Sequence, residues 1–211
     1  MKAMHRAIAV LAATAAAAAI VVGPASAAGR GPGWSQWGTT GATGTYGMGM
    51  GRMGGWANGT MPCIDGLASG TLTDAERASF AAMAGEEKLA QDVYAYLAKQ
   101  YPSYPQFGRI SLAETQHLQS VRAVLARYGI NDPTAGLAAG VFANADRQAQ
   151  YASLIASATD AAAALRVGIT IEKADIADLA NLLKTVTAPD VRQLLTMLDR
   201  ASDMHLAAFG G

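Results

Sequence analysis

The chain has 211 residues and a mass of 21.6 kDa, with 16 basic and 16 acidic residues and a formal net charge of +0. This balance argues against a nucleic-acid-binding protein, because such proteins normally carry a basic patch. Cys63 is the single cysteine, which excludes an internal disulfide and a zinc or iron–sulfur site built from several thiolates. Any metal site in the helical part must therefore use oxygen and imidazole ligands.

The first 70 residues predict export and a linker rather than a packed domain. Residues 1–27 combine a basic start, an apolar run and the small-residue sequence PASA, which ends at Ala27; this is typical of a secretory signal peptide. The apolar run is short for a membrane-spanning helix, so we expect cleavage near Ala27, no stable membrane anchor and a secreted or periplasmic protein. Residues 28–70 are rich in Gly, Thr and Met without an apolar period, which predicts a flexible linker. Methionines near Cys63 offer soft ligands for Cu(I), although a linker that binds no metal fits the same composition.

Residues 71–211 have the pattern of a helical domain. The sequence TDAE at residues 73–76 is a capping box, and the helix that it opens is expected to end near Gln100. Two prolines then break the chain. A second helix is expected at about residues 106–128, with Gly129 as its stop.

The second half of the domain predicts a crossover and three further helices. Residues 130–144 are expected to form the crossover, and residues 145–157 a short helix. Thr159 is expected to cap a third long helix at about residues 160–186, and Thr187 a fourth. Four long helices with two short connections and one long crossover predict an all-α, ferritin-like four-helix bundle.

Each long helix carries an apolar stripe that is interrupted by polar side chains. Glu114 and His117, one turn apart, interrupt the stripe of the second helix, and Ser202 and His205 interrupt that of the fourth at the same spacing. Buried acids without partners would cost several kcal/mol each, whereas two divalent cations, iron or manganese, would neutralise them. Glu86 lies off its stripe and is expected to face water. The candidate metal ligands are Glu87, Glu114, His117, Glu172, Asp175 and His205.

On these residues the chain resembles the ferritin-like superfamily and, within it, the family called domain of unknown function 2202. The resemblance covers about residues 72–209. Residues 83–98, MAGEEKLAQDVYAYLA, are similar to the first helix of the rubrerythrin di-iron domain, with Glu87 in a ligand position. Glu114 and His117 match the E-x-x-H motif of its second helix. The resemblance therefore implies a di-metal carboxylate site.

The third and fourth helices resemble the rubrerythrin pattern less closely. Glu172 and Asp175 match the acid pair of the third helix, with Asp in place of the second Glu. On the fourth helix the expected E-x-x-H is SDMH, so His205 is present and Ser202 replaces the Glu. The resemblance then implies either one tightly and one loosely held cation or an asymmetric pair, in which Asp175 or a water fills the vacant position.

Three functions are compatible with this pattern. The first, suggested by the similarity to rubrerythrins, is a di-iron or di-manganese oxidoreductase, peroxidase-like or catalase-like, that acts on peroxide or dioxygen, with Tyr94 as a candidate proton donor or radical site. The chain has no rubredoxin-like cysteine motif, so such an enzyme needs an external electron donor unless it disproportionates peroxide. The second is a non-enzymatic module that binds or buffers metal. The third is a metal-free helical interaction domain in which the acids form salt bridges, such as Glu172 with Lys173; a homo-oligomer is compatible with each.

Overall fold

The structure is a computed structural model that describes residue 64 and residues 66–211. The expected signal peptide and most of the expected linker lie outside these residues. The described part is all-helical, with five helices and no strand. None of its helices has the combination of length and hydropathy that a membrane span requires.

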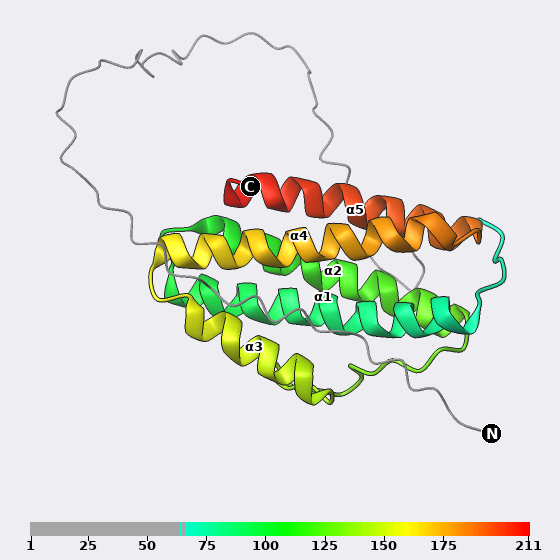
Figure 1. Ribbon diagram of the computed structural model, residues 1–211, viewed down its shortest axis with the longest axis horizontal. Helices are drawn as coiled ribbons and strands as arrows, with labels where there is room; N and C mark the ends of the chain where they lie inside the picture. Colours follow the sequence, from blue (N-terminus) through cyan, green and yellow to red (C-terminus); the bar gives the residue numbers. More distant parts are fainter. Residues whose placement is uncertain (1–63, 65) are drawn as a thin grey trace, which may run out of the picture. The chain divides into compact units, whose positions relative to one another are not determined.

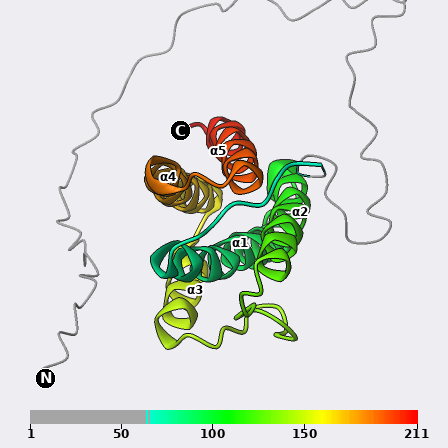
Figure 2. The ribbon, with the colours of Figure 1, turned by 90° about the vertical axis from the view of Figure 1, so that its right-hand side faces the viewer.

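Four long helices and one short helix form the domain, as expected, with bounds close to the predicted ones. They are α1 (Asp74–Gln100), α2 (Pro105–Arg127), α3 (Ala145–Ser157), α4 (Ala161–Thr185) and α5 (Pro189–Phe209). Figure 2 looks along the helices and shows α1 beside α2 and α4 beside α5. Contacts of α1 with α4 and of α2 with α5 join these two pairs into a bundle (Figure 1). The short helix α3 lies in the crossover from α2 to α4 and packs against both α1 and α4.

The ends of α1 and α2 follow the local signals in the sequence. The Thr73 hydroxyl accepts a hydrogen bond from the backbone N–H of Glu76 at 3.2 Å, and the Glu76 carboxylate accepts one from the backbone N–H of Thr73 at 2.8 Å. Helix α2 stops at Gly129, whose φ of 61° is a left-handed conformation that glycine adopts without steric cost. The capping box and the glycine stop are thus confirmed.

Two predicted caps are wrong. Asp160, and not Thr159, caps α4, and its carboxylate accepts a hydrogen bond from the backbone N–H of Ala163 at 2.7 Å. Ala188, and not Thr187, precedes α5, which begins with a proline and has no side-chain cap. Both helices begin one residue later than expected: Asp is preferred over Thr as a cap, and proline is favoured in the first turn.

The apolar core consists of two clusters. One contains Phe80, Met83, Val121, Leu195 and their neighbours, and the other contains Tyr94, Leu97, Phe107, Phe209 and theirs. On each long helix, the residues between the two clusters are the polar ones that interrupt the predicted stripes. A polar layer therefore crosses the bundle between two apolar clusters.

Candidate metal centre

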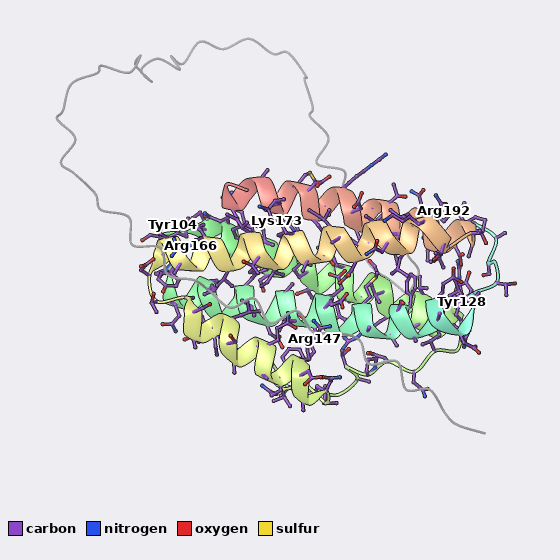
Figure 3. The ribbon with its side chains drawn as sticks, viewed as in Figure 1. Tyr104, Tyr128, Arg147, Arg166, Lys173 and Arg192 are labelled. Carbon is purple, nitrogen blue, oxygen red and sulfur yellow. The ribbon has the colours of Figure 1, made fainter. Side chains whose placement is uncertain are left out.

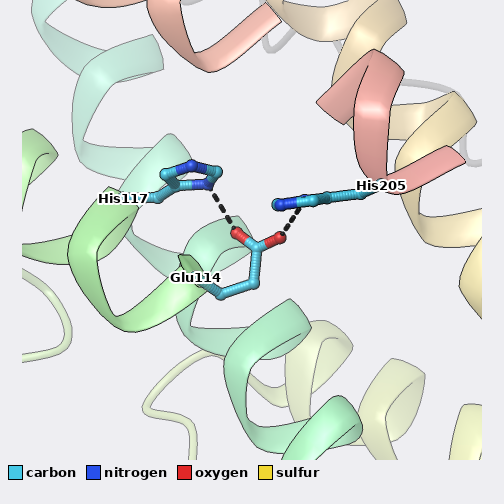
Figure 4. Close-up of side chains that lie close together, drawn as sticks. All are labelled: Glu114, His117 and His205. Carbon is cyan, nitrogen blue, oxygen red and sulfur yellow. Dashed lines mark hydrogen bonds and ion pairs between the residues drawn. The ribbon is translucent and has the colours of Figure 1, made fainter. Parts of the chain in front are cut away.

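Glu114 of α2 lies at the centre of the polar layer, between two imidazoles. Its Oε2 is 2.8 Å from Nδ1 of His117, and its Oε1 is 2.9 Å from Nδ1 of His205 (Figure 4). One potential ligand atom from each of these three residues lies within 4.8 Å of the others. The two rings are stacked, with centroids 5.4 Å apart. A single carboxylate thus presents one oxygen to an imidazole from α2 and the other to an imidazole from α5.

A second carboxylate approaches each imidazole from another helix. Oε2 of Glu87, on α1, is 3.5 Å from Nδ1 of His117, and Oε1 of Glu172, on α4, is 3.6 Å from Nδ1 of His205. The layer therefore has two halves that share Glu114, each with one imidazole and one further acid. Lys173 is exposed (Figure 3) and forms no ion pair with Glu172 in the described part of the chain, so the salt bridge considered for this pair is not formed.

Asp175 lies beside these two halves and is held by α5. The Ser202 hydroxyl donates to Oδ2 of Asp175 at 2.5 Å and also contacts the backbone carbonyl of Leu198. Ser202 precedes His205 by three residues, the spacing at which Glu114 precedes His117. At the position on α5 that corresponds to Glu114, the chain thus has a hydroxyl that binds a carboxylate from α4.

The electrostatics of the layer follow from burial and from the shared carboxylate. Burial raises the pKa of Glu87 well above its usual value and raises that of Asp175 to about 7. Burial also opposes ionisation of Glu114, but the two imidazoles outweigh it and lower its pKa to about 2. For His205, burial favours the neutral ring, whereas Glu114 and Glu172 favour the charged ring and raise its pKa to about 9. In the absence of a cation, protons therefore compensate the charge of the acids.

The donor set fits divalent cations. Among the described residues, Oε1 of Glu87 is buried without any hydrogen-bond partner, and Nδ1 of His205 contacts Oε1 of Glu114 at 2.9 Å without the geometry of a hydrogen bond. Buried polar atoms without a partner are rare in folded proteins, and both of these incompletely satisfied atoms belong to the polar layer. Carboxylate oxygens and imidazole nitrogens are ligands that suit iron and manganese. Four carboxylates carry the charge that two divalent cations would neutralise with both imidazoles neutral.

Tyr94 and Glu86 also contact the polar layer or lie next to it, and the sequence indicates their roles only in part. The buried Tyr94 hydroxyl donates to Oε1 of Glu172 at 2.6 Å, and burial beside this acid raises the tyrosine pKa well above its usual value. Glu86, which was expected to face water, is half-buried, and its Oε1 accepts from Nη2 of Arg147 at 3.0 Å. That prediction was wrong because it took no account of α3, which covers this part of α1.

The profile of the family described as "uncharacterized protein domain (DUF2202)" matches residues 76–210, more than half of the chain. The chain belongs to the DUF2202 family. The matched range covers all five helices except the first residues of α1. The expected membership in this family is thus confirmed.

A similar protein and a similar solved structure are from an archaeon. Uncharacterized protein MJ0754 of Methanocaldococcus jannaschii is 32% identical over 147 residues, which span 69% of this chain and 79% of the relative. The crystal structure of hypothetical protein MJ0754 from Methanococcus jannaschii DSM 2661 is similar to the present one with a TM-score of 0.65 and 32% identity, over 68% of this chain and 82% of that chain. These names state no activity, so the functional argument for the DUF2202 domain depends on its side chains.

Proposed function

We propose that the DUF2202 domain is a ferritin-like di-metal carboxylate module that holds two divalent cations, iron or manganese. Glu87, Glu114 and His117 would hold one cation, and Glu114, Glu172 and His205 the other. The observation that carries this proposal is the position of Glu114, which offers one oxygen to each imidazole. The buried Oε1 of Glu87, which has no hydrogen-bond partner among the described residues, supports it.

The further proposal is that the domain is an oxidoreductase that acts on peroxide or dioxygen. Such a pair of redox-active cations supplies Lewis acidity and electron transfer when it is bound. Disproportionation of two molecules of hydrogen peroxide to two of water and one of dioxygen is balanced without another reagent, whereas net reduction of peroxide requires an external electron donor. Tyr94 keeps its proton at neutral pH because of its raised pKa, and its hydroxyl orients Glu172 through their hydrogen bond.

A non-enzymatic, metal-buffering module is the second candidate. The observation in its favour is Ser202, which has no charge at the position on α5 that corresponds to Glu114 on α2. A module with fewer anionic ligands would hold one cation more loosely than the other. Reversible binding of this kind suits storage or buffering rather than turnover.

Peroxide turnover separates the two candidates. We expect the full chain, loaded with manganese or iron, to consume hydrogen peroxide and release dioxygen, and the Glu114→Ala variant to lose this activity. Asp203→Asn, which changes an exposed acid of α5 outside the layer, is the matched control and should retain it. Equal rates in wild type and Glu114→Ala would contradict an enzyme that uses this site. Cation binding without turnover would favour the buffering module.

We also propose export of the chain, on the basis of the signal-peptide pattern in residues 1–27. Mass measurement of the protein purified after expression in a bacterial host with a secretion system would test this. A mature chain that begins near residue 28 is expected, and a full-length intracellular chain would contradict export.

A further inference from the structure

A pocket of about 130 Å³ leads from the surface to the polar layer. It lies between α1 and α4, and residues of α3 form part of its wall. Its inner end is lined by the buried carboxylates Glu87, Glu114 and Glu172. Its outer end includes the exposed Asp178 and the half-buried Glu86. The gradient of exposure along the lining shows that the pocket connects solvent with the candidate metal ligands.

The lining of this pocket is strongly acidic. Besides the three buried glutamates, Glu86, Asp175 and Asp178 line it, and Arg147 is its one basic residue. A cleft lined by one sign of charge focuses the electric field and raises the local concentration of the opposite ion. The pocket therefore attracts divalent cations and disfavours anions.

The inner end of the pocket has an acceptor that lacks a partner. Glu87 is 2% exposed, lines the pocket, and has an Oε1 without a hydrogen-bond partner. A cation that arrives through the pocket would meet this carboxylate as it enters the layer. The acidic lining and the unpartnered oxygen are independent observations, and both indicate a cationic ligand.

Arg147 lies at the outer end of the pocket and lowers its negative charge. It lies on α3 (Figure 3), and its Nη2 donates to Oε1 of Glu86 at 3.0 Å while its Nη1 donates to Gln150 at 2.8 Å. Its guanidinium neutralises part of the charge at the mouth and ties one oxygen of Glu86 to α3. Through Arg147, α3 therefore affects the charge at the mouth of the pocket.

We propose that this pocket is the route by which divalent cations reach the polar layer, with Glu86 and Asp178 as the receiving carboxylates and Arg147 as the residue that limits their charge. The inference rests on the proposed function, because it assumes that the layer binds cations. To the proposed metal centre this inference adds a path for the cation and residues that affect the rate of binding rather than the final set of ligands.

The rate of cation uptake tests the proposal. The full chain is freed of metal with a chelator and mixed rapidly with Co(II), whose visible absorption reports ligation. For the Glu86→Gln/Asp178→Asn variant we expect uptake at low salt to be slower by about tenfold, since removing steering charges lowers association rates. This difference should shrink at high salt, where exposed charges are screened. The number of Co(II) ions bound at saturation should not change.

Matched variants make the test specific. Asp203→Asn, on the exposed side of α5, also removes one acid but should leave the uptake rate unchanged, and Arg147→Gln should raise it. Asp178→Asn alone changes an exposed side chain, so this single variant replaces the double variant if the latter folds poorly. We expect it to lower the rate of Co(II) uptake by less than the double variant. If wild type binds Co(II) and all variants take it up at the same rate, the route is wrong and the metal centre stands. If wild type binds no Co(II), the proposed function itself is contradicted.

Discussion

Asp175 determines how many carboxylates are available to the half of the layer that contains Glu172 and His205. It comes from α4, yet Ser202 of α5 fixes it by a hydrogen bond at 2.5 Å. A carboxylate held in this way adds an acid from α4 beside Ser202, where α5 itself has only a hydroxyl. Its pKa of about 7, raised by burial, indicates that its environment favours the proton until a cation replaces it.

Replacing Asp175 by Asn should weaken the binding of one cation and leave the binding of the other unchanged. We expect the second cation to bind at least about tenfold more weakly, which is within the range seen when groups that support a metal are removed. Ser202→Ala keeps the carboxylate and should have a smaller effect. Titration calorimetry with Mn(II) measures both steps. Two unchanged binding steps in Asp175→Asn would show that this residue only holds α4 against α5.

The imidazole of His205 makes cation binding dependent on pH. Burial alone would lower its pKa, but Glu114 and Glu172 raise it to about 9. A cation requires the neutral ring, so binding should release a proton and tighten as pH rises from 6.5 to about 9. Calorimetry in buffers of different ionisation enthalpy reports the released protons. Affinity that is constant across this interval would contradict His205 as a ligand.

The same raised pKa has the opposite effect on the cation-free protein. A group whose pKa is higher in the folded state than in the unfolded state stabilises the fold fully below its unfolded pKa, here 6.5. This contribution is lost as pH rises through about 9. The stability of the cation-free chain should therefore fall over the interval in which cation affinity increases.

At the scale of the helices, Gly168 allows α4 and α5 to approach each other closely. A Cβ atom at this position would lie 2.6 Å from the ring of Phe209. That ring also packs against Tyr94 and Phe107, with centroids 5.2 and 5.5 Å away. The absence of a side chain at Gly168 thus lets Phe209 pack directly against α4 in the apolar cluster next to the polar layer.

Gly168→Ala should destabilise the fold by about 1–3 kcal/mol, because the added methyl overpacks this contact. Gly108→Ala is the matched control: its Cβ would lie 3.8 Å from the nearest side chain. In α2 this change should stabilise the chain by about 0.5–1 kcal/mol through helix propensity. Denaturant unfolding measures both values. A stabilised Gly168→Ala variant would show that α4 and α5 are not as close as described.

The crossover is attached to α1 by a buried ion pair that the sequence did not indicate. Lys88 donates to Asp92 and, at 2.9 Å, to the backbone carbonyl of Ala138, while Asp92 accepts from the backbone N–H of Gly140 at 2.9 Å. Both side chains are buried. This attachment holds the crossover that leads into α3, and α3 in turn forms part of the pocket wall.

Helix boundaries were predictable because their signals are local. The capping box at Thr73, the stop at Gly129 and the alternating apolar stripes each depend on residues a few positions apart. Contacts between helices were not predictable in this way, since spacing within one helix does not identify its neighbour. Glu86 is an example: its partner, Arg147, is 61 residues away in the chain.

At the scale of the whole molecule, the polar layer explains why four separate helices carry the same interruption. Each helix supplies its ionisable residues at the level that separates the two apolar clusters. The six candidate ligands could be proposed from the sequence, because acids and imidazoles on apolar stripes are costly unless they meet. Their division into two halves that share Glu114 could not, because it depends on side-chain geometry.

Cation stoichiometry is the most direct test of this arrangement. The chelator-treated chain is equilibrated with Mn(II) or, without oxygen, Fe(II), and bound metal per chain is measured after removal of the free ion. We predict two cations per chain for wild type and fewer than two for Glu114→Gln, since the amide offers one oxygen where the carboxylate offers two. Wild type that retains no more metal than a correctly folded Glu114→Gln variant would contradict a shared, cation-binding carboxylate.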